Sequence, residues 1–227
     1  MPLYPLFLKL DGRRCVVVGG GTVAARKVRA LLECGARVTV VSPEIRAELE
    51  KCAEANEIKI VHRAFEPGDL EGAAIAIAAT NDRKVNEAVA NAGRERGVLV
   101  NVVDVPGLCD FYVPSRVDRG DLQIAICTGG AFPAFAKRLR LALEKQFGPE
   151  FAAYLELLAR YRQEAKARIA DPHQRAKAEE AFLDSPAFAL VAEGKYEEAE
   201  KALSACLARL SNKDKQDIGD EEESCPS

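Results

Sequence analysis

The stretch Cys15-Val16-Val17-Val18-Gly19-Gly20-Gly21-Thr22-Val23-Ala24 decides the fold. Its apolar run predicts a buried β-strand, and a helical pattern follows the glycines at once. Glycines in this position could serve only to turn the chain, but strand, spacing and helix together satisfy the G-x-G-x-x-G/A pattern of a dinucleotide site. Gly19 permits the tight turn, Gly21 lets backbone approach a pyrophosphate, and Ala24 lets the helix pack closely. We therefore predict cofactor contacts at Gly19, Gly21, Thr22, Val23 and Ala24.

Short β-rich runs alternate with helical patterns from residue 14 to about residue 104, which is typical of a parallel sheet covered by helices. Strands are predicted at Cys15–Val18, Arg37–Val41, Ile58–Arg63, Ala73–Ala79 and Leu99–Val102. Helices are predicted at Val23–Cys34, Glu44–Ala55 and Asp82–Arg96. Because crossovers between parallel strands are right-handed, the fold class is α/β, with a Rossmann-like doubly wound parallel sheet.

The pattern changes beyond Pro106. Strand-like Phe111–Val113 and Leu122–Cys127 flank a turn at Arg119-Gly120-Asp121, and a helix over 133–147 follows, so we expect a small α+β region. From residue 151 the strands disappear, and the chain becomes a helical region with breaks at Asp171-Pro172, Ser185-Pro186 and Gly194. The acidic segment 211–227 has little apolar content and is expected to be disordered.

The composition excludes several classes of protein. With 32 basic and 35 acidic residues, the net charge of −3 gives no general reason to expect nucleic acid or an anionic membrane as a partner. The longest apolar runs are too short to span a bilayer and the first residues lack a basic signal region, so we expect a cytoplasmic protein. Seven scattered cysteines and two histidines form neither a disulfide framework nor ligand spacing, so no metal site is predicted.

The choice of cofactor depends on the end of the second strand. The usual acidic residue is replaced there by Ser42, with Glu44 and Arg46 shortly after it. Glu44 could accept from a ribose hydroxyl, which favours NAD and contacts at Pro43 and Glu44. Ser42 with Arg46 could instead admit the 2′-phosphate of NADP, or Ser42-Pro43-Glu44 could simply start a helix.

Chemistry is expected outside the carboxyl ends of the strands, where an open α/β sheet binds its ligands. Thr80 and Asn81 follow the fourth strand and are predicted to contact the cofactor. Asp104 follows the fifth strand and precedes the rigid Pro106-Gly107, which would hold a carboxylate at the edge of an apolar site for proton transfer. An ordinary turn aspartate is the alternative.

Two further features could hold an anionic substrate. Thr128-Gly129-Gly130 precedes the helix over 133–147 and offers free backbone N–H groups, although it could be only a turn. Basic side chains could clamp a polycarboxylate or could form solvated helix faces. They are Arg26, Lys27, Arg116, Arg119, Lys137, Arg138 and Arg140.

Four motifs together resemble the precorrin-2 dehydrogenase family, the dehydrogenase and chelatase part of siroheme synthase that also occurs as a stand-alone protein. They occur over residues 1–210 in the family's order and spacing. The motifs are Val18-Gly19-Gly20-Gly21-Thr22-Val23-Ala24-Ala25-Arg26-Lys27, Ala78-Ala79-Thr80-Asn81-Asp82 with Val85-Asn86, Asn101-Val102-Val103-Asp104, and Gly129-Gly130 with Pro133.

The resemblance implies NAD-dependent oxidation of precorrin-2 to sirohydrochlorin by a homodimer. It implies an NAD-binding domain over 1–113, a dimerisation region over 114–148 and a helical substrate-site region over 149–210, before the acidic tail 211–227. Asp104 matches the aspartate implicated in proton transfer. Tetrapyrrole contacts are expected at Asn101, Arg116, Thr128, Gly129 and Gly130.

The chain departs from the family's pattern at Cys127-Thr128 and Phe132, where relatives are often rich in serine, which puts any role of a serine there in doubt. Some family members also insert ferrous iron into sirohydrochlorin, and the sequence leaves that activity open. Two alternative functions are also open, and each predicts different binding behaviour. A non-catalytic, NAD-sensing dimeric module would bind NAD without turnover, and an unrelated oxidoreductase on the same fold would not bind a bulky macrocycle.

Overall fold

The computed structural model describes residues 3–223 of the chain. It contains two compact units, the first formed by Met1–Val113 with Cys127–Pro133 and the second by Pro114–Ile126 with Ala134–Ser227. The short segment Cys127–Pro133 therefore returns to the first unit, so the predicted second glycine turn belongs with the dinucleotide motif.

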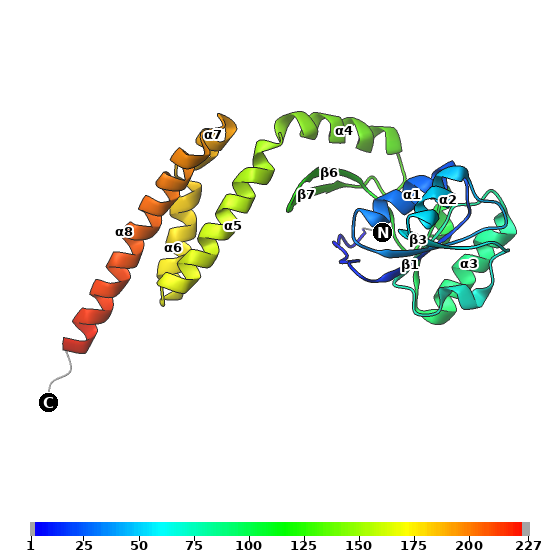
Figure 1. Cartoon of the computed structure of the whole chain (residues 1–227), viewed down its shortest axis with the longest axis horizontal. Helices are drawn as coiled ribbons and strands as arrows, with labels where there is room; N and C mark the ends of the chain where they lie inside the picture. The colour runs from blue at the N-terminus through cyan, green and yellow to red at the C-terminus, as the bar shows by residue number, and fades with distance from the viewer. Residues whose placement is uncertain (1–2, 224–227) are drawn as a thin grey trace. The chain divides into compact units, whose positions relative to one another are not determined.

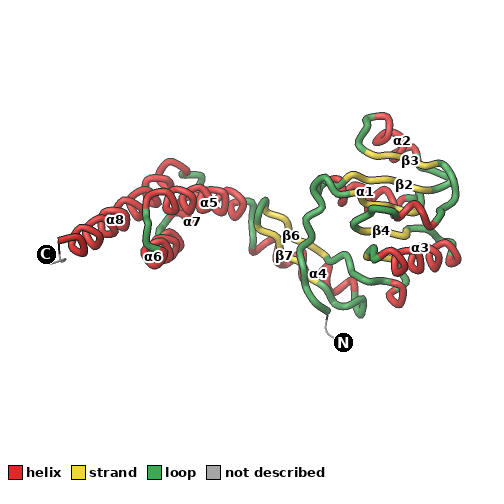
Figure 2. Tube along the Cα trace, turned by 90° about the horizontal axis from the view of Figure 1, so that it is seen from below, coloured by secondary structure: helices red, strands yellow, loops and turns green. Residues whose placement is uncertain are grey.

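The first unit is built on a parallel five-stranded sheet in the order β3-β2-β1-β4-β5. Figure 2 shows the strands of this sheet in yellow. The chain crosses from one side of β1 to the other between β3 and β4, which confirms the doubly wound prediction. The strands are β1 (Arg14–Val18), β2 (Arg37–Val41), β3 (Ile58–Val61), β4 (Ile75–Ala78) and β5 (Leu99–Val102).

Helices cover both faces of this sheet. Figure 1 shows α1 (Thr22–Leu32) and α2 (Ala47–Glu54) on one side of the strands and α3 (Arg83–Arg96) on the other. Successive residues of a strand point to opposite faces. Accordingly, Cys15 and Val17 of β1 pack with the α1 face, whereas Val16 and Val18 pack with the α3 face. The continuous apolar run of β1 is therefore explained by burial on both faces.

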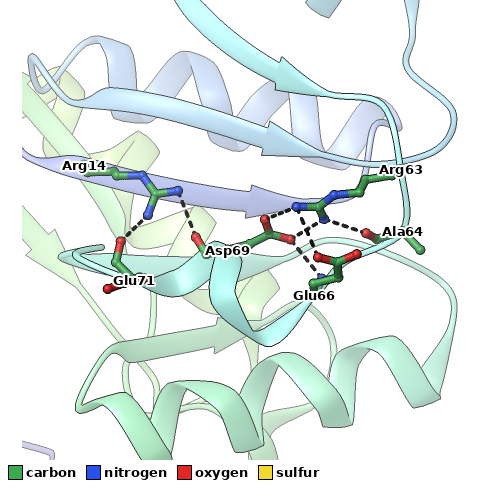
Figure 3. Close-up of polar contacts among 6 residues, drawn as sticks. All are labelled: Arg14, Arg63, Ala64, Glu66, Asp69 and Glu71. Atoms are coloured by element: carbon green, nitrogen blue, oxygen red, sulfur yellow. Dashed lines mark hydrogen bonds and ion pairs between the residues drawn. The ribbon is translucent and has the colours of Figure 1, made fainter.

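The connection from β3 to β4 contains only the 3-10 turn η1 (Pro67–Leu70) and is closed by polar contacts (Figure 3). The Arg63 guanidinium binds both carboxylate oxygens of Asp69, at 2.8 Å and 2.7 Å. The backbone N–H of Glu66 donates to the same carboxylate at 2.9 Å, and Arg14 donates to the Asp69 carbonyl at 2.9 Å. These contacts fix a crossover that lacks a full helix.

The second helix begins later than the sequence predicts. The expected start at Glu44 is wrong, because α2 begins at Ala47 and the Ser42 hydroxyl donates to the Glu44 carbonyl (2.8 Å) instead of capping a helix. Residues 42–46 instead pass directly over the glycine turn, where the N–H of Arg46 donates to the Gly20 carbonyl at 3.1 Å. Residues 43 and 44 form a bend there, and the helix starts only after Arg46.

The predicted strand at Phe111–Val113 is also wrong. The 3-10 turn η2 (Pro106–Leu108) follows β5, and the strand is instead β6 (Ser115–Arg119), which pairs with β7 (Leu122–Ile126) in an antiparallel hairpin. The turn at Gly120 has a φ of 65°, as its glycine predicts. Of the β6 residues only Val117 is fully buried, so the polar sequence of this strand carries little β signal.

The second unit continues with the helices α4 (Pro133–Gln146), α5 (Glu150–Arg168), α6 (Pro172–Leu183), α7 (Ala187–Ala192) and α8 (Tyr196–Glu223). The last four share one apolar core that contains Leu157, Phe182 and Leu203. The helices break at Asp171-Pro172, Ser185-Pro186 and Gly194, as predicted, and the Asp171 side chain caps α6.

The acidic end of the chain differs from the expectation of disorder as far as it is described. The backbone of α8 continues as a helix to Glu223. Extending a helix that has already nucleated adds one hydrogen bond per residue and needs little apolar content. The last four residues lie outside the described part.

The sequence predicts no membrane span, no disulfide framework and no metal site, and the described residues can be inspected for each of these features. No helix between residues 3 and 223 combines the length and apolarity that crossing a membrane needs. The six cysteines of this part of the chain are all free, and Cys225 lies outside it. The described residues also contain no cluster of three metal-binding side chains.

Candidate functional site

The glycine turn after β1 leaves no room for a side chain at its first position. Gly19 has a φ of 117°, and a Cβ placed there would lie 2.3 Å from the Ala79 carbonyl oxygen. Its N–H donates to the Val41 carbonyl at 2.9 Å. Gly19 therefore ties the ends of β2 and β4 to the end of β1, which confirms that this turn must be glycine.

The middle glycine is equally constrained, although the sequence motif gives it no role. A Cβ at Gly20 would lie 2.0 Å from the Glu44 carbonyl oxygen. The residues expected to contact the cofactor, Pro43 and Glu44, are exposed and lie in this overlying segment. Ser42 is buried at 8% exposure, and its hydroxyl already donates to Glu44. Glu44 is therefore the exposed acidic group beside the turn, whereas the Ser42 hydroxyl is directed into the backbone.

The third glycine faces open space. No atom of the described residues beyond its chain neighbours lies within 4 Å of a Cβ built on Gly21. Gly21 is the N-cap of α1, and the described residues supply no side chain that caps this end of the helix. The first N–H groups of a helix lack partners within it and attract anions. Thr22 and Val23 are exposed at this end, whereas Ala24 is fully buried against the sheet. The turn thus fits the pyrophosphate of a dinucleotide.

The loop after β4 is held by Asn86 of α3. Its side-chain amide, 5% exposed, donates to the Thr80 carbonyl at 3.1 Å. The Thr80 hydroxyl accepts from the N–H of Asp82 at 2.9 Å, and Asp82 caps α3 through the N–H groups of Lys84 and Val85. Asn81 is left exposed between them. This fixed turn places Thr80 and Asn81 at the same sheet edge as Gly19.

Asp104 lies in a strained loop directly after β5. It is exposed and has a φ of 60°, a left-handed conformation that aspartate adopts more readily than most residues. Unusual backbone conformations of this kind gather at functional sites. Because Asp104 directly follows β5, it lies at the sheet edge formed by the carboxyl ends of the strands, as the sequence predicts.

The Cys109 side chain holds the loop that carries Asp104. Its thiol lies 3.1 Å from the Val102 carbonyl and 3.4 Å from the Val105 carbonyl, and the N–H of Val102 approaches the sulfur at 3.3 Å. The thiol thus binds backbone on both sides of Asp104. Burial raises the pKa of Cys109, which keeps the thiol protonated and able to donate. Sequence reasoning missed this residue because a cysteine five positions beyond Asp104 follows no known pattern.

Lys27 brings a positive charge to the same loop. Burial lowers the pKa of its ammonium group and Arg26 lowers it further, whereas Asp104 and then Cys109 raise it. Lys27 is half-buried, while Arg26 is exposed. The helical spacing of Lys27 from the buried Ala24 is a signal in the sequence that could have separated it from the other basic residues.

The second glycine turn lies against the Asp104 loop. A Cβ at Gly130 would be 3.4 Å from Tyr112 and 3.9 Å from Pro106. Gly129 and Gly130 have φ values of 61° and 81°, so both need the freedom of glycine. The structure therefore brings this turn beside residues that follow Asp104.

The other residues that the sequence predicts to bind substrate are partly or fully buried, or belong to the second unit. Thr128 uses its hydroxyl to accept from the N–H of Phe132 at 3.4 Å. Asn101 is 7% exposed, and its amide donates to the Phe111 carbonyl at 2.9 Å, so its side chain holds the chain that leaves β5. Arg116 lies in the second unit, where its Nε is 3.8 Å from Asp118. Their contacts with substrate stay predictions.

Comparisons with known families match successive parts of the chain. Residues 6–115 match the family described as NAD(P)-binding, 119–146 the sirohaem biosynthesis protein central region, and 152–207 the sirohaem synthase dimerisation region. The region described as dimerising thus falls on α5 to α8, whereas the sequence prediction assigned dimerisation to 114–148 and the substrate site to 149–210.

Individual relatives agree with these regions. The chain is 41% identical to siroheme synthase of Methylococcus capsulatus over 203 residues, which cover 89% of this chain and 43% of that protein. It is 39% identical to siroheme synthase of Thioalkalivibrio sulfidiphilus over 207 residues, 91% of this chain and 42% of that protein. The chain therefore spans less than half the length of these relatives.

A solved structure titled SirC, precorrin-2 dehydrogenase, matches at a TM-score of 0.76 and 26% identity, over 89% of this chain and 100% of that one. The three matched regions follow one another along this chain, and its identity to the siroheme synthase of Methylococcus capsulatus extends over most of its length. The chain therefore resembles siroheme synthases in successive NAD(P)-binding, central and dimerisation regions.

Proposed function

We propose that this chain is an NAD-dependent precorrin-2 dehydrogenase that forms sirohydrochlorin in siroheme biosynthesis. One observation carries the proposal: the open helix N-terminus at Gly21 and the left-handed Asp104 belong to the same edge of one parallel sheet. The likeness to a solved precorrin-2 dehydrogenase over the whole of that chain supports it.

The residues around the glycine turn bind the cofactor. The N–H groups that begin α1 hold the pyrophosphate, and Gly21 leaves room for its approach. Glu44, exposed beside the turn, accepts from the adenosine ribose, while the fixed turn at Thr80 and Asn81 bounds the nicotinamide side. When bound, NAD would serve as the hydride acceptor of the reaction.

Asp104 accepts the proton that the macrocycle loses as its conjugation extends. A carboxylate fixed by its own loop needs little rearrangement at the moment of transfer, and a positioned base contributes about 100- to 10,000-fold to a rate. Cys109 keeps the backbone around Asp104 in place. The turn at Gly129 and Gly130 lies beside Pro106 and binds a carboxylate of the substrate, chiefly through the N–H of Gly130, because the N–H of Gly129 already approaches the Cys127 sulfur at 3.4 Å. Asn101 and Thr128 complete the proposed substrate contacts of this unit, and a contact from Arg116, which belongs to the second unit, stays a prediction from the resemblance.

The protein works as a cytoplasmic homodimer in this proposal. Residues 1–113 bind NAD, and the helices within 152–207 associate with a second copy, in keeping with the description of the family region that they match. Light scattering of the purified chain is expected to give twice the monomer mass, and a monomer at micromolar concentration would contradict it.

The test is an anaerobic mixture of the purified protein with precorrin-2 and NAD, followed by the absorbance of sirohydrochlorin and of NADH. Both products are expected to form in equal amounts. Substituting NADP is expected to slow the reaction, because the acidic Glu44 lies beside the turn. NAD binding without turnover would favour a sensing module. Adding ferrous iron to sirohydrochlorin in a separate sample tests iron insertion as a second activity.

A further inference from the structure

The first described residues of the chain, 3–8, form an apolar segment that is exposed to solvent. Five of these six residues are large and apolar, with exposed fractions between 41% and 88%. They are Leu3, Tyr4, Leu6, Phe7 and Leu8. No hydrogen bond joins residues 3–9 to another described residue, and burial begins only at Leu10. A contiguous exposed apolar stretch of this kind marks a place where something binds.

Leu3 lies beside the second glycine turn. A Cβ built on Gly129 would lie 4.0 Å from the Cδ1 of Leu3, which is the distance of an ordinary van der Waals contact. A Cβ built on the next residue, Gly130, would lie 3.9 Å from Pro106. Pro106 follows Asp104 by two positions, and all of these residues belong to the first unit. The apolar segment therefore adjoins the turn and the loop that contribute to the proposed substrate site.

The groups proposed above to bind substrate are polar. They are the carboxylate of Asp104, the N–H of Gly130 and the side chains of Asn101 and Thr128. Pockets that hold large organic ligands are lined mostly by apolar and aromatic side chains, and a few polar groups fix the orientation of the ligand. A tetrapyrrole has a broad apolar face and carboxylates at its edge, so it needs both kinds of surface. The apolar segment beside the turn offers the second kind, and Phe132, 64% exposed directly after the turn, adds to it.

We propose that residues 3–7 form an apolar wall of the tetrapyrrole site, with Leu3 and the Tyr4 ring against the face of the macrocycle whose carboxylate the Gly130 N–H binds. The macrocycle, and not a second copy of the chain, is the expected occupant because Leu3 lies beside the turn that binds the carboxylate. Apolar burial and offset stacking of the Tyr4 ring favour the bound state. The wall holds substrate and transition state alike, so it determines the KM more than kcat. This role rests on the function proposed above.

The first experiment measures binding without turnover. The purified full chain is titrated with sirohydrochlorin anaerobically in the absence of NAD, and the fluorescence anisotropy of sirohydrochlorin gives the Kd. Tyr4→Ala is expected to raise the Kd about tenfold and Leu3→Ala about threefold. Tyr4→Phe keeps the ring and should bind as the parent does.

Leu99→Ala is the matched control for this titration. Leu99 is also exposed, but it lies at the start of β5, whereas Asp104 follows the end of that strand. Its substitution removes an exposed leucine from the same unit at the other edge of the sheet, so the Kd for sirohydrochlorin should stay that of the parent.

The second experiment compares the kinetics with precorrin-2 and NAD. Tyr4→Ala should raise the KM for precorrin-2 about tenfold, while kcat changes by less than about twofold and the Kd for NAD is unchanged. Its Tm should equal that of the parent, since substitution of an exposed side chain has little effect on stability. Light scattering gives the mass of each variant, which should also equal that of the parent.

Tyr4→Ala and Leu3→Ala proteins that bind sirohydrochlorin as tightly as the parent would overturn the proposal, as would a parent chain that does not bind it. A lower mass of either variant would also overturn it, because the segment would then cover a second copy. An equal loss of binding in Leu99→Ala would show a general effect on the fold and would count against the wall. If the parent binds sirohydrochlorin but does not oxidise precorrin-2, the proposed function fails, and the Kd values still decide whether the segment contacts the macrocycle.

Discussion

The Cα of Gly19 lies so close to the end of β4 that a methyl group on it would stand 2.3 Å from the Ala79 carbonyl oxygen. This contact joins the dinucleotide turn to the strand that precedes Thr80 and Asn81. The neighbouring Gly21 has open space at the same position, so the two glycines serve different purposes. The first closes the fold, and the second admits the cofactor.

Alanine at these two glycines should therefore separate stability from binding. We expect Gly19→Ala to lower the free energy of unfolding by about 2–4 kcal/mol, because the clash adds to a φ of 117°. Gly21→Ala should change it by about 1 kcal/mol or less but weaken NAD binding about tenfold or more. Urea denaturation and calorimetric titration with NAD measure the two effects. Similar losses of stability in both variants would contradict this assignment.

The contact between Asp69 and Arg63 should make the free energy of unfolding depend on pH in the acidic range. Arg63 holds the pKa of the Asp69 carboxyl below its usual value near 4, although burial acts in the opposite direction. Because the pKa is lower in the folded state, the stabilisation is complete above the unfolded value and is lost as pH falls through the folded one. Urea denaturation at several pH values should show that Asp69→Asn is less stable than the parent at pH 7, and that the difference shrinks below pH 4. A constant difference would rule out this linkage.

Asn86 should contribute to stability through the carbonyl that it binds. We expect Asn86→Ala to lower the free energy of unfolding by about 1–3 kcal/mol, since it leaves the Thr80 carbonyl without its amide donor. Asn91→Ala, an exposed site on the same helix, provides the control and should change stability by about 0.5 kcal/mol or less. Chemical denaturation of the two variants gives the comparison, and equal losses would show that the Thr80 contact contributes little.

The cysteines should differ in their reaction with iodoacetamide. The thiolate is the reactive form, and burial raises the pKa of both Cys15 and Cys109. Cys127 is exposed and is expected to be alkylated first at pH 7.5, with Cys109 following more slowly and Cys15 last. Mass spectrometry of peptides over time provides the order. Faster modification of Cys109 than of Cys127 would mean that the thiol contacts around Asp104 do not persist in solution.

The sequence predicts well the parts of this chain whose structure depends on local pattern. The apolar run Val16–Val18, the glycines after it and the cap at Asp82 each specify one structure, and the helical breaks at Pro172 and Gly194 follow from backbone chemistry. The same local rules predicted the position of Asp104 at the end of β5.

The errors arise where distant segments determine the structure. Residues 42–46 bend over Gly20 instead of starting a helix. Similarly, β6 is a strand because it pairs with β7, although its own residues are mostly polar. The thiol contacts of Cys109 exist only after the loop has closed. The periodicity of the local sequence contains no information about these contacts. The resemblance to the family allowed a more specific prediction of function than residue spacing alone.

The central claim is that Asp104 is the base of an NAD-dependent oxidation of precorrin-2, and its most direct test is the turnover of Asp104→Ala under anaerobic conditions. We expect the formation of sirohydrochlorin and NADH to fall by about 100-fold or more while the Kd for NAD stays that of the parent protein. Turnover equal to that of the parent would contradict the account.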